Sequence, residues 1–117
     1  MYIGKLAKLS GATPKAIRLY ESKGLIPVAN RLGKYRIYSD SDLVLVHMIR
    51  RGQAAGFSLD EMKRLIEHKA RTGQFALNMA NELIAKKREL LRHEVARIMS
   101  LDRQLEELHE EVNRTFG

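Results

Sequence analysis

Residues 13–38 read TPKAIRLYESKGLIPVANRLGKYRIY, and this stretch decides the fold. Thr13 can cap a helix, and Pro14 suits the first helical turn, where no backbone N–H is needed. Gly24 supplies a left-handed exit from the helix. The last four residues, 35–38, alternate in the manner of a strand. The sequence therefore predicts a short helix followed by a hairpin.

The predicted helix carries a polar, basic face. Lys15, Arg18 and Ser22 recur at helical spacing, so they share one side of it. Glu21 is the lone acid in this basic region. We expect Glu21 to hold Arg18 or a helix end in place rather than to touch a ligand. A basic helix of this kind suits a grooved polyanion, and duplex DNA is the partner that we infer.

The hairpin is expected over residues 28–38, with residues 30–34 as its turn. Arg31, Lys34 and Arg36 place three cations on it. Such a hairpin can lie along a phosphate backbone as a wing, beside a helix that enters the groove. The alternative is an ordinary solvated surface hairpin.

The charge of the chain is concentrated in its first half. The whole chain has a net charge of +7. Residues 1–57 hold ten Lys and Arg against three Asp and Glu, whereas residues 58–117 hold eleven of each kind. An excess confined to one compact half is the electrostatic footprint of a nucleic-acid-binding protein. An anionic membrane surface is a poorer partner, because the basic helix is too short and polar to insert.

Two further short helices surround this stretch. Residues 3–10 predict a helix that Gly11 ends, and a tight turn then leads to Thr13. Two short helices joined by a glycine turn form a helix-turn-helix, although spacing alone leaves a simple helical hairpin open. Downstream, Ser39 is expected to cap a third helix, which ends near Gly56.

A fourth helix begins at a capping box. Ser58 and Glu61 occupy its reciprocal positions, and apolar residues follow at helical spacing. Residues 69–75 are then expected to form a polar connector. The sequence thus predicts two parts, a DNA-binding domain over residues 1–72 and a long helix over residues 73–117.

The long helix is expected over residues 74–115, which contain neither Gly nor Pro. Its apolar residues follow a seven-residue repeat, the pattern of a coiled-coil seam. The seam positions that we assign to dimerisation are Leu77, Ile84, Leu91, Ile98, Leu101, Leu105, Leu108 and Val112. Lys87 and Glu94 interrupt the seam and are expected to set its register, facing one another in an antiparallel pair. The alternative is one amphipathic helix folded back on the N-terminal core.

Several kinds of chemistry are excluded or unsupported. The chain has no cysteine, so disulfides and thiolate metal ligands are ruled out. Its four histidines lack metal-ligand spacing, and no catalytic constellation or phosphate loop is present. No apolar run approaches the roughly 18 residues of a membrane span. We therefore expect no cofactor, no metal, no enzymatic activity and no membrane partner, and a cytoplasmic protein. A coiled-coil adaptor with a basic docking face is the competing class.

Three motifs together resemble the MerR family of bacterial transcription regulators over essentially the whole chain. Residues 16–25, AIRLYESKGL, are similar to the helix signature of that family. Residues 34–38, KYRIY, resemble its wing, and residues 56–61, GFSLDE, its third conserved block. Most members carry two tyrosines after the arginine, where this chain has Leu19 and Tyr20.

The resemblance implies a mostly α-helical protein, a winged helix-turn-helix followed by a long dimerisation helix paired antiparallel. It implies a homodimer that binds a pseudo-palindromic operator. The bound dimer bends and untwists the promoter DNA so that RNA polymerase can use the promoter. The residues that we assign to DNA binding are Lys15, Arg18, Tyr20, Arg31, Lys34, Tyr35, Arg36 and Tyr38. Among these, Tyr20 and Tyr38 are expected to offer hydroxyls to phosphates or to lie in the core.

The sequence leaves two alternatives for the signal that controls the regulator. A small apolar molecule bound at the dimer ends, near Phe75, Met79 and Phe116, is one possibility. Control by abundance, without a ligand, is the other.

Overall fold

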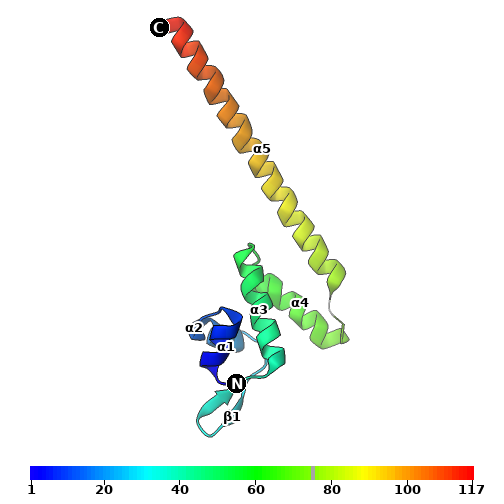
Figure 1. Cartoon of the computed structure of the whole chain (residues 1–117). Coiled ribbons are helices and arrows are strands. Elements are labelled where there is room, and N and C mark those ends of the chain that lie inside the picture. The colour runs from blue at the N-terminus through cyan, green and yellow to red at the C-terminus, as the bar shows by residue number, and fades with distance from the viewer. Residues whose placement is uncertain (75) are drawn as a thin grey trace. The chain divides into compact units, whose positions relative to one another are not determined.

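The computed structural model describes residues 1–74 and 76–117 of the chain. It forms two compact units, Met1–Ala76 and Leu77–Gly117. The first unit contains four helices and a two-stranded hairpin among its described residues, and the second is one long helix (Figure 1).

The helix-turn-helix consists of α1 (Ile3–Ser10) and α2 (Pro14–Ser22). Gly11 ends α1 with a left-handed φ of 77°, and its N–H donates to the Ala7 carbonyl. Thr13 caps α2 by accepting the Ala16 N–H at 3.1 Å. The expected boundaries of both helices are confirmed.

The hairpin is tighter than the sequence suggested. Strand β1 (Asn30–Leu32) pairs antiparallel with β2 (Tyr35–Ile37), so the turn consists of Gly33 and Lys34 alone. The five-residue turn expected over residues 30–34 is wrong, because its first three residues satisfy their backbone groups in the ladder. Gly33 has a φ of 61°, the left-handed value that a tight hairpin turn requires at its first position.

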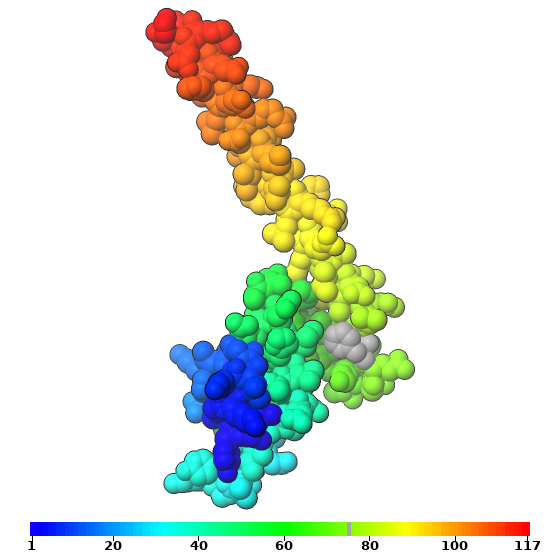
Figure 2. Space-filling view, viewed as in Figure 1, coloured from blue at the N-terminus to red at the C-terminus, as the bar shows by residue number. Residues whose placement is uncertain are grey.

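The hairpin is also tied to the start of the chain. The Met1 amino group donates to the Tyr38 carbonyl at 2.7 Å, and the Tyr38 N–H donates to the Met1 carbonyl at 2.7 Å. In the space-filling view the hairpin projects from the lower edge of the first unit, next to the first residues (Figure 2). The structure therefore presents it as a wing.

The remaining helices of this unit are α3 (Asp40–Ala54) and α4 (Leu59–Thr72). Both begin with capping boxes, formed by Ser39 with Asp42 and by Ser58 with Glu61. Because α4 continues to Thr72, the connector expected from residue 69 onward is wrong for its first four residues. Lys69 to Thr72 remain helical because the helix meets its first left-handed glycine only at Gly73, where φ is 75°.

One hydrophobic core holds α1, α2, α3 and the base of the wing together. Its buried members are Leu6, Ala12, Ile17, Tyr20, Leu25, Ile26, Tyr38, Val46 and Ile49. Leu43 and Leu45 of α3, and Leu59, Met62 and Ile66 of α4, pack against this cluster. The third and fourth helices thus complete a core that two short helices cannot build alone.

The second unit is helix α5 (Leu77–Phe116), 40 residues long. It begins three residues later than expected, since Gln74 lies outside any helix. At 1.5 Å per residue it extends about 60 Å. Phe75, one of the residues expected near a small apolar ligand, lies outside the described residues. No helix in the described part of the chain is long and apolar enough to cross a bilayer.

Candidate nucleic-acid interface

The outer face of α2 carries the cations that the sequence assigned to it. Lys15, Arg18 and Ser22 are exposed, while Ile17 is completely buried on the opposite side of the helix. These side chains border an open hollow of about 910 Å³, which Arg36 borders from β2. The helix face and the wing therefore contribute to the same surface.

A second hollow lies along the wing. It measures about 280 Å³, and its lining includes Arg18, Arg31, Lys34, Tyr35 and Arg36. Two of these cations, Arg18 and Arg36, border both hollows. The structure thus brings the five cations that the sequence assigned to DNA onto one continuous surface that spans helix and wing.

Aromatic rings contribute to the wing. Tyr35 is 59% exposed and packs against Tyr2 with ring centroids 5.7 Å apart. The Lys34 ammonium lies 5.7 Å from the centroid of Tyr35. Tyr2 was not assigned by sequence reasoning, since a residue next to the first helix gives no sign that a distant hairpin will pack on it.

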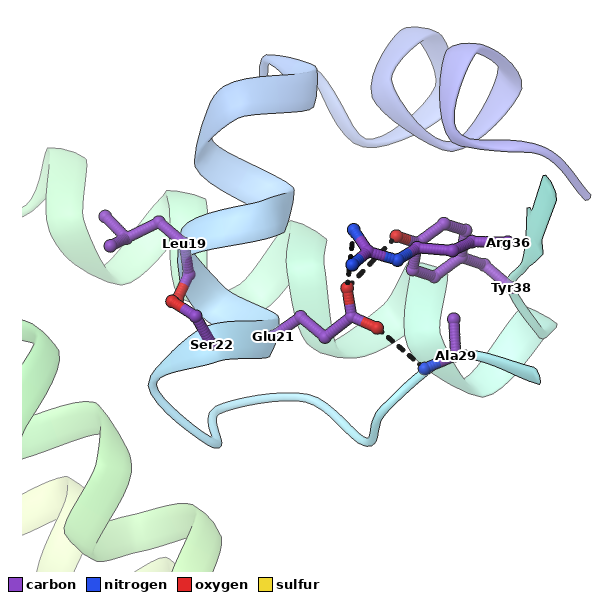
Figure 3. A network of polar contacts seen from close by, with 6 residues as sticks. All are labelled: Leu19, Glu21, Ser22, Ala29, Arg36 and Tyr38. Carbon is purple, nitrogen blue, oxygen red and sulfur yellow. Dashed lines mark hydrogen bonds and ion pairs between the residues drawn. The ribbon is translucent and has the colours of Figure 1, made fainter. Parts of the chain in front are cut away.

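The sequence led us to expect that Glu21 holds Arg18 or a helix end in place. In the structure its carboxylate joins α2 to the wing (Figure 3). Its Oε1 accepts the Ala29 backbone N–H at 2.7 Å. Its Oε2 lies 3.3 Å from Nη1 of Arg36 and 3.4 Å from the hydroxyl of Tyr38, which donates to it. In the sequence Glu21 stands out only as an acid among cations. Its partners could not be identified there, because they lie outside its own helix.

Tyr20 and Tyr38 lie in the core, one of the two placements that the sequence left open for them. They are 3% and 2% exposed. The Tyr20 hydroxyl donates to Oε1 of Gln53 at 2.6 Å, which joins α2 to α3. Burial raises the pKa of both phenols, and the Glu21 carboxylate further raises that of Tyr38. Both hydroxyls therefore stay protonated and donate within the protein.

The described residues show no sign of a metal site, since residues 1–74 and 76–117 contain no cluster of three His, Asp or Glu suited to hold an ion. Of the side chains considered for an apolar ligand, Met79 is 42% and Phe116 is 83% exposed. The cationic surface of α2 and the wing is the binding feature that the geometry supports.

Two family models and several known proteins match this chain. A family model described as MerR HTH family regulatory protein matches residues 1–69, and one described as MerR, DNA binding matches residues 43–108. The HTH-type transcriptional regulator HmrR of Sinorhizobium medicae is 35% identical over 112 residues, which cover 92% of this chain and 74% of HmrR. The chain spans only about half the length of two other relatives, 51% of one and 52% of the other.

Solved structures share the fold. The chain is similar to the lead(II) complex of the transcription regulator PbrR691 from Ralstonia metallidurans, with a TM-score of 0.70 and 29% identity over 94% of this chain and 86% of that one. It is also similar to HiNmlR, a MerR family regulator lacking the sensor domain, bound to promoter DNA. That TM-score is 0.66, with 23% identity over 91% of this chain and 78% of that one.

Replacing Arg18 by Gln tests the cationic surface. If Arg18 contacts a phosphate, affinity will fall for all duplexes alike, and the slope of log affinity against log salt will flatten by about 0.9 for each phosphate that is no longer bound. Fluorescence anisotropy at several salt concentrations measures this slope. Arg71→Gln, at the exposed end of α4, is the matched control and should leave the slope near that of the original chain. A loss restricted to one sequence would instead make Arg18 a base-reading residue.

Replacing Tyr20 by Phe tests the core assignment. Removal of the hydroxyl should lower the free energy of unfolding by about 0.5–1.5 kcal/mol, because the bond to Gln53 is removed. The DNA affinity of the folded protein should change by no more than about twofold. Such a change is far smaller than the factor of ten that corresponds to about 1.4 kcal/mol. Thermal unfolding and anisotropy measure the two quantities. A large loss of affinity at unchanged stability would return the hydroxyl to the DNA interface.

Proposed function

Because this chain belongs to the MerR family of promoter-binding transcription regulators, which are not enzymes, we propose that it acts as a homodimer on a pseudo-palindromic operator. It works in the cytoplasm, where it bends and untwists promoter DNA so that RNA polymerase can use the promoter. The cationic surface formed by α2 and the wing supplies the DNA contacts. Each copy places Lys15, Arg18, Arg31, Lys34 and Tyr35 against the duplex.

The observation that carries the dimer is the exposed seam of α5. Its eight assigned residues are all between 44% and 65% exposed: Leu77, Ile84, Leu91, Ile98, Leu101, Leu105, Leu108 and Val112. Burying one such side chain fully is worth about 1.5–3 kcal/mol. Because these side chains are already about half buried, full burial adds about half of that for each, on the order of 12–24 kcal/mol for eight from each copy. This gain stands against the roughly 4–15 kcal/mol that association costs in lost freedom of motion.

An antiparallel pair with complete overlap of the two helices uses this seam well. Ile84 then lies opposite Leu108 of the partner subunit, and Leu91 opposite Leu101 of the partner subunit. On the flank, Arg88 comes opposite Asp102 of the partner subunit, a charge pair that recurs on both sides of the two-fold axis. The complementary charges favour this register.

This register revises the expected role of Lys87 and Glu94. Complete overlap places them at different levels of the coiled coil, so they do not face one another. Glu94 instead pairs with Arg97 of its own helix, whose guanidinium Nε lies 3.3 Å from the Glu94 carboxylate. The acid that enters the seam is thus neutralised within its own chain, which limits the cost of burying it.

Bending of the operator is part of the same proposal. In a dimer, two cationic surfaces belong to one assembly, and the DNA deforms to meet both. Deformation of a short duplex costs about 1–6 kcal/mol, which phosphate contacts at both ends offset. An adaptor that only binds proteins would show no salt-sensitive affinity for duplex DNA.

Disulfide cross-linking tests the orientation, because the chain has no cysteine of its own. The double variant Ile84→Cys, Leu108→Cys should form a covalent dimer on mild oxidation, since the proposed register brings these positions together. Each single variant serves as a control and should remain monomeric on a non-reducing gel. Efficient cross-linking of either single variant would mean a parallel pair and would overturn the antiparallel arrangement.

Disrupting the seam tests whether function needs the dimer. The variant Leu91→Lys, Ile98→Lys should be monomeric by analytical ultracentrifugation, because two buried charges on each copy oppose association. Its affinity for the operator found upstream of its own gene should fall by at least about a hundredfold, since linked binding of two sites is abolished. Glu106→Lys, Glu110→Lys, which changes residues outside the seam, is the control. A monomer that binds the operator as tightly as the original chain would refute the proposed function.

A further inference from the structure

We propose that Glu21 is a positioning residue for DNA recognition, whose carboxylate locks the wing to α2 through Arg36 and the Ala29 backbone. This inference rests on the proposed function, because it concerns the same cationic surface. It assigns Arg36 a role different from that of the other cations. Arg36 acts as a strut between helix and wing, whereas the exposed cations contact the duplex.

The carboxylate reaches both arms of the hairpin at once (Figure 3). Oε1 holds the Ala29 N–H, directly before β1, at 2.7 Å. Oε2 lies within 3.4 Å of both Arg36 on β2 and the Tyr38 hydroxyl directly after it. A two-stranded hairpin of three-residue strands is marginal by itself, so its position depends on such attachments.

The pairing register of the wing creates a need for this acid. Arg31 lies directly opposite Arg36 across the two strands. Like charges at opposed positions destabilise a strand pair. The Glu21 carboxylate, 3.3 Å from the Arg36 guanidinium, offsets one of the two charges. Arg31 is left as the exposed cation of the pair.

Burial distinguishes this pair from a surface ion pair. The Glu21 side chain is only 7% exposed, and that of Arg36 is 36% exposed. Removing either side chain leaves the other without its opposite charge in a largely buried position, so loss of Arg36 or of Glu21 disturbs the partner. Arg36 also borders both hollows, so its placement sets how the α2 face meets the wing.

Electrostatics and positioning predict opposite signs for removal of the acid. Without Glu21 the surface would be more positive, and every duplex would be attracted more strongly. If Glu21 positions the wing, its removal instead weakens binding to the operator, because recognition of the operator depends on the shape of the surface. Binding to random duplexes is not weakened. The ratio of operator affinity to random-duplex affinity therefore reports the positioning role, and a change in overall stability alone would not move it.

The first experiment measures this ratio for Glu21→Gln, which can still accept from Ala29 but cannot form the ion pair. Operator affinity should fall about tenfold, the effect of removing one hydrogen bond to a charged group, while random-duplex affinity stays equal or rises. Asp40→Asn, an exposed acid in the first turn of α3, is the charge-matched control and should leave the ratio unchanged. Equal or increased operator affinity in Glu21→Gln would overturn the proposal.

The second experiment is a double-mutant cycle with Arg36→Gln. If Arg36 acts through Glu21, each single variant and the double variant should show a similar fall in operator affinity, and the salt slope should stay unchanged. Effects that multiply, with a slope that flattens by about 0.9 per phosphate, would make Arg36 an independent phosphate ligand and overturn the strut. Should Glu21→Gln fail to fold in a thermal melt, the slope of Arg36→Gln alone decides.

Different results would refute the proposed function and the role assigned to Glu21. A chain that shows no salt-dependent affinity for any duplex would refute the proposed function. A chain that binds its operator as expected, but whose Glu21→Gln variant keeps the ratio of affinities, would refute only the role assigned to Glu21.

Discussion

The buried face of α2 is the constraint on which the rest of the structure depends. Ile17 and Tyr20 are 0% and 3% exposed, and they pack into the core shared with α1 and α3. Because a helix turns about 100° per residue, burying these positions directs Lys15 and Arg18 to the opposite side. The packing that stabilises the unit thus also orients the cations, and the proposed DNA surface needs no separate scaffold.

Glu21 shows how affinity and shape are balanced on this surface. Charge alone would favour cations at every position that faces a polyanion. A buried carboxylate in their midst lowers that general attraction and links the helix to the hairpin that projects beside it. Phosphate contacts can orient a protein on DNA only if the contacting side chains are held at fixed positions. A rigid connection between α2 and the wing provides this, and net charge alone does not.

Helix α5 differs from the first unit in what stabilises it. The first unit buries its own apolar residues, whereas α5 exposes a row of leucines and isoleucines over its length. In the proposed dimer these side chains gain their burial from a second copy. Stability of the coiled coil then depends on the concentration of the chain, which links the amount of protein to the occupancy of the operator.

The sequence by itself determined the features that arise from neighbours along the chain. Caps at Thr13, Ser39 and Ser58 start their helices as expected, and the family signature identified the winged helix-turn-helix. Backbone caps and a seven-residue repeat depend on groups a few positions apart, so they can be recognised without a fold.

Only the tertiary structure decided which side chains meet across the core. Tyr20 donates to Gln53, 33 positions away, and Tyr38 donates to Glu21, 17 positions away. Neither tyrosine could be assigned to core or DNA from its sequence, since both roles suit a ring with a hydroxyl. The short turn of the wing was equally hidden, because turn-forming residues also fit a strand once a partner strand satisfies their backbone groups. Such choices depend on contacts between distant segments, and these exist only after the chain has folded.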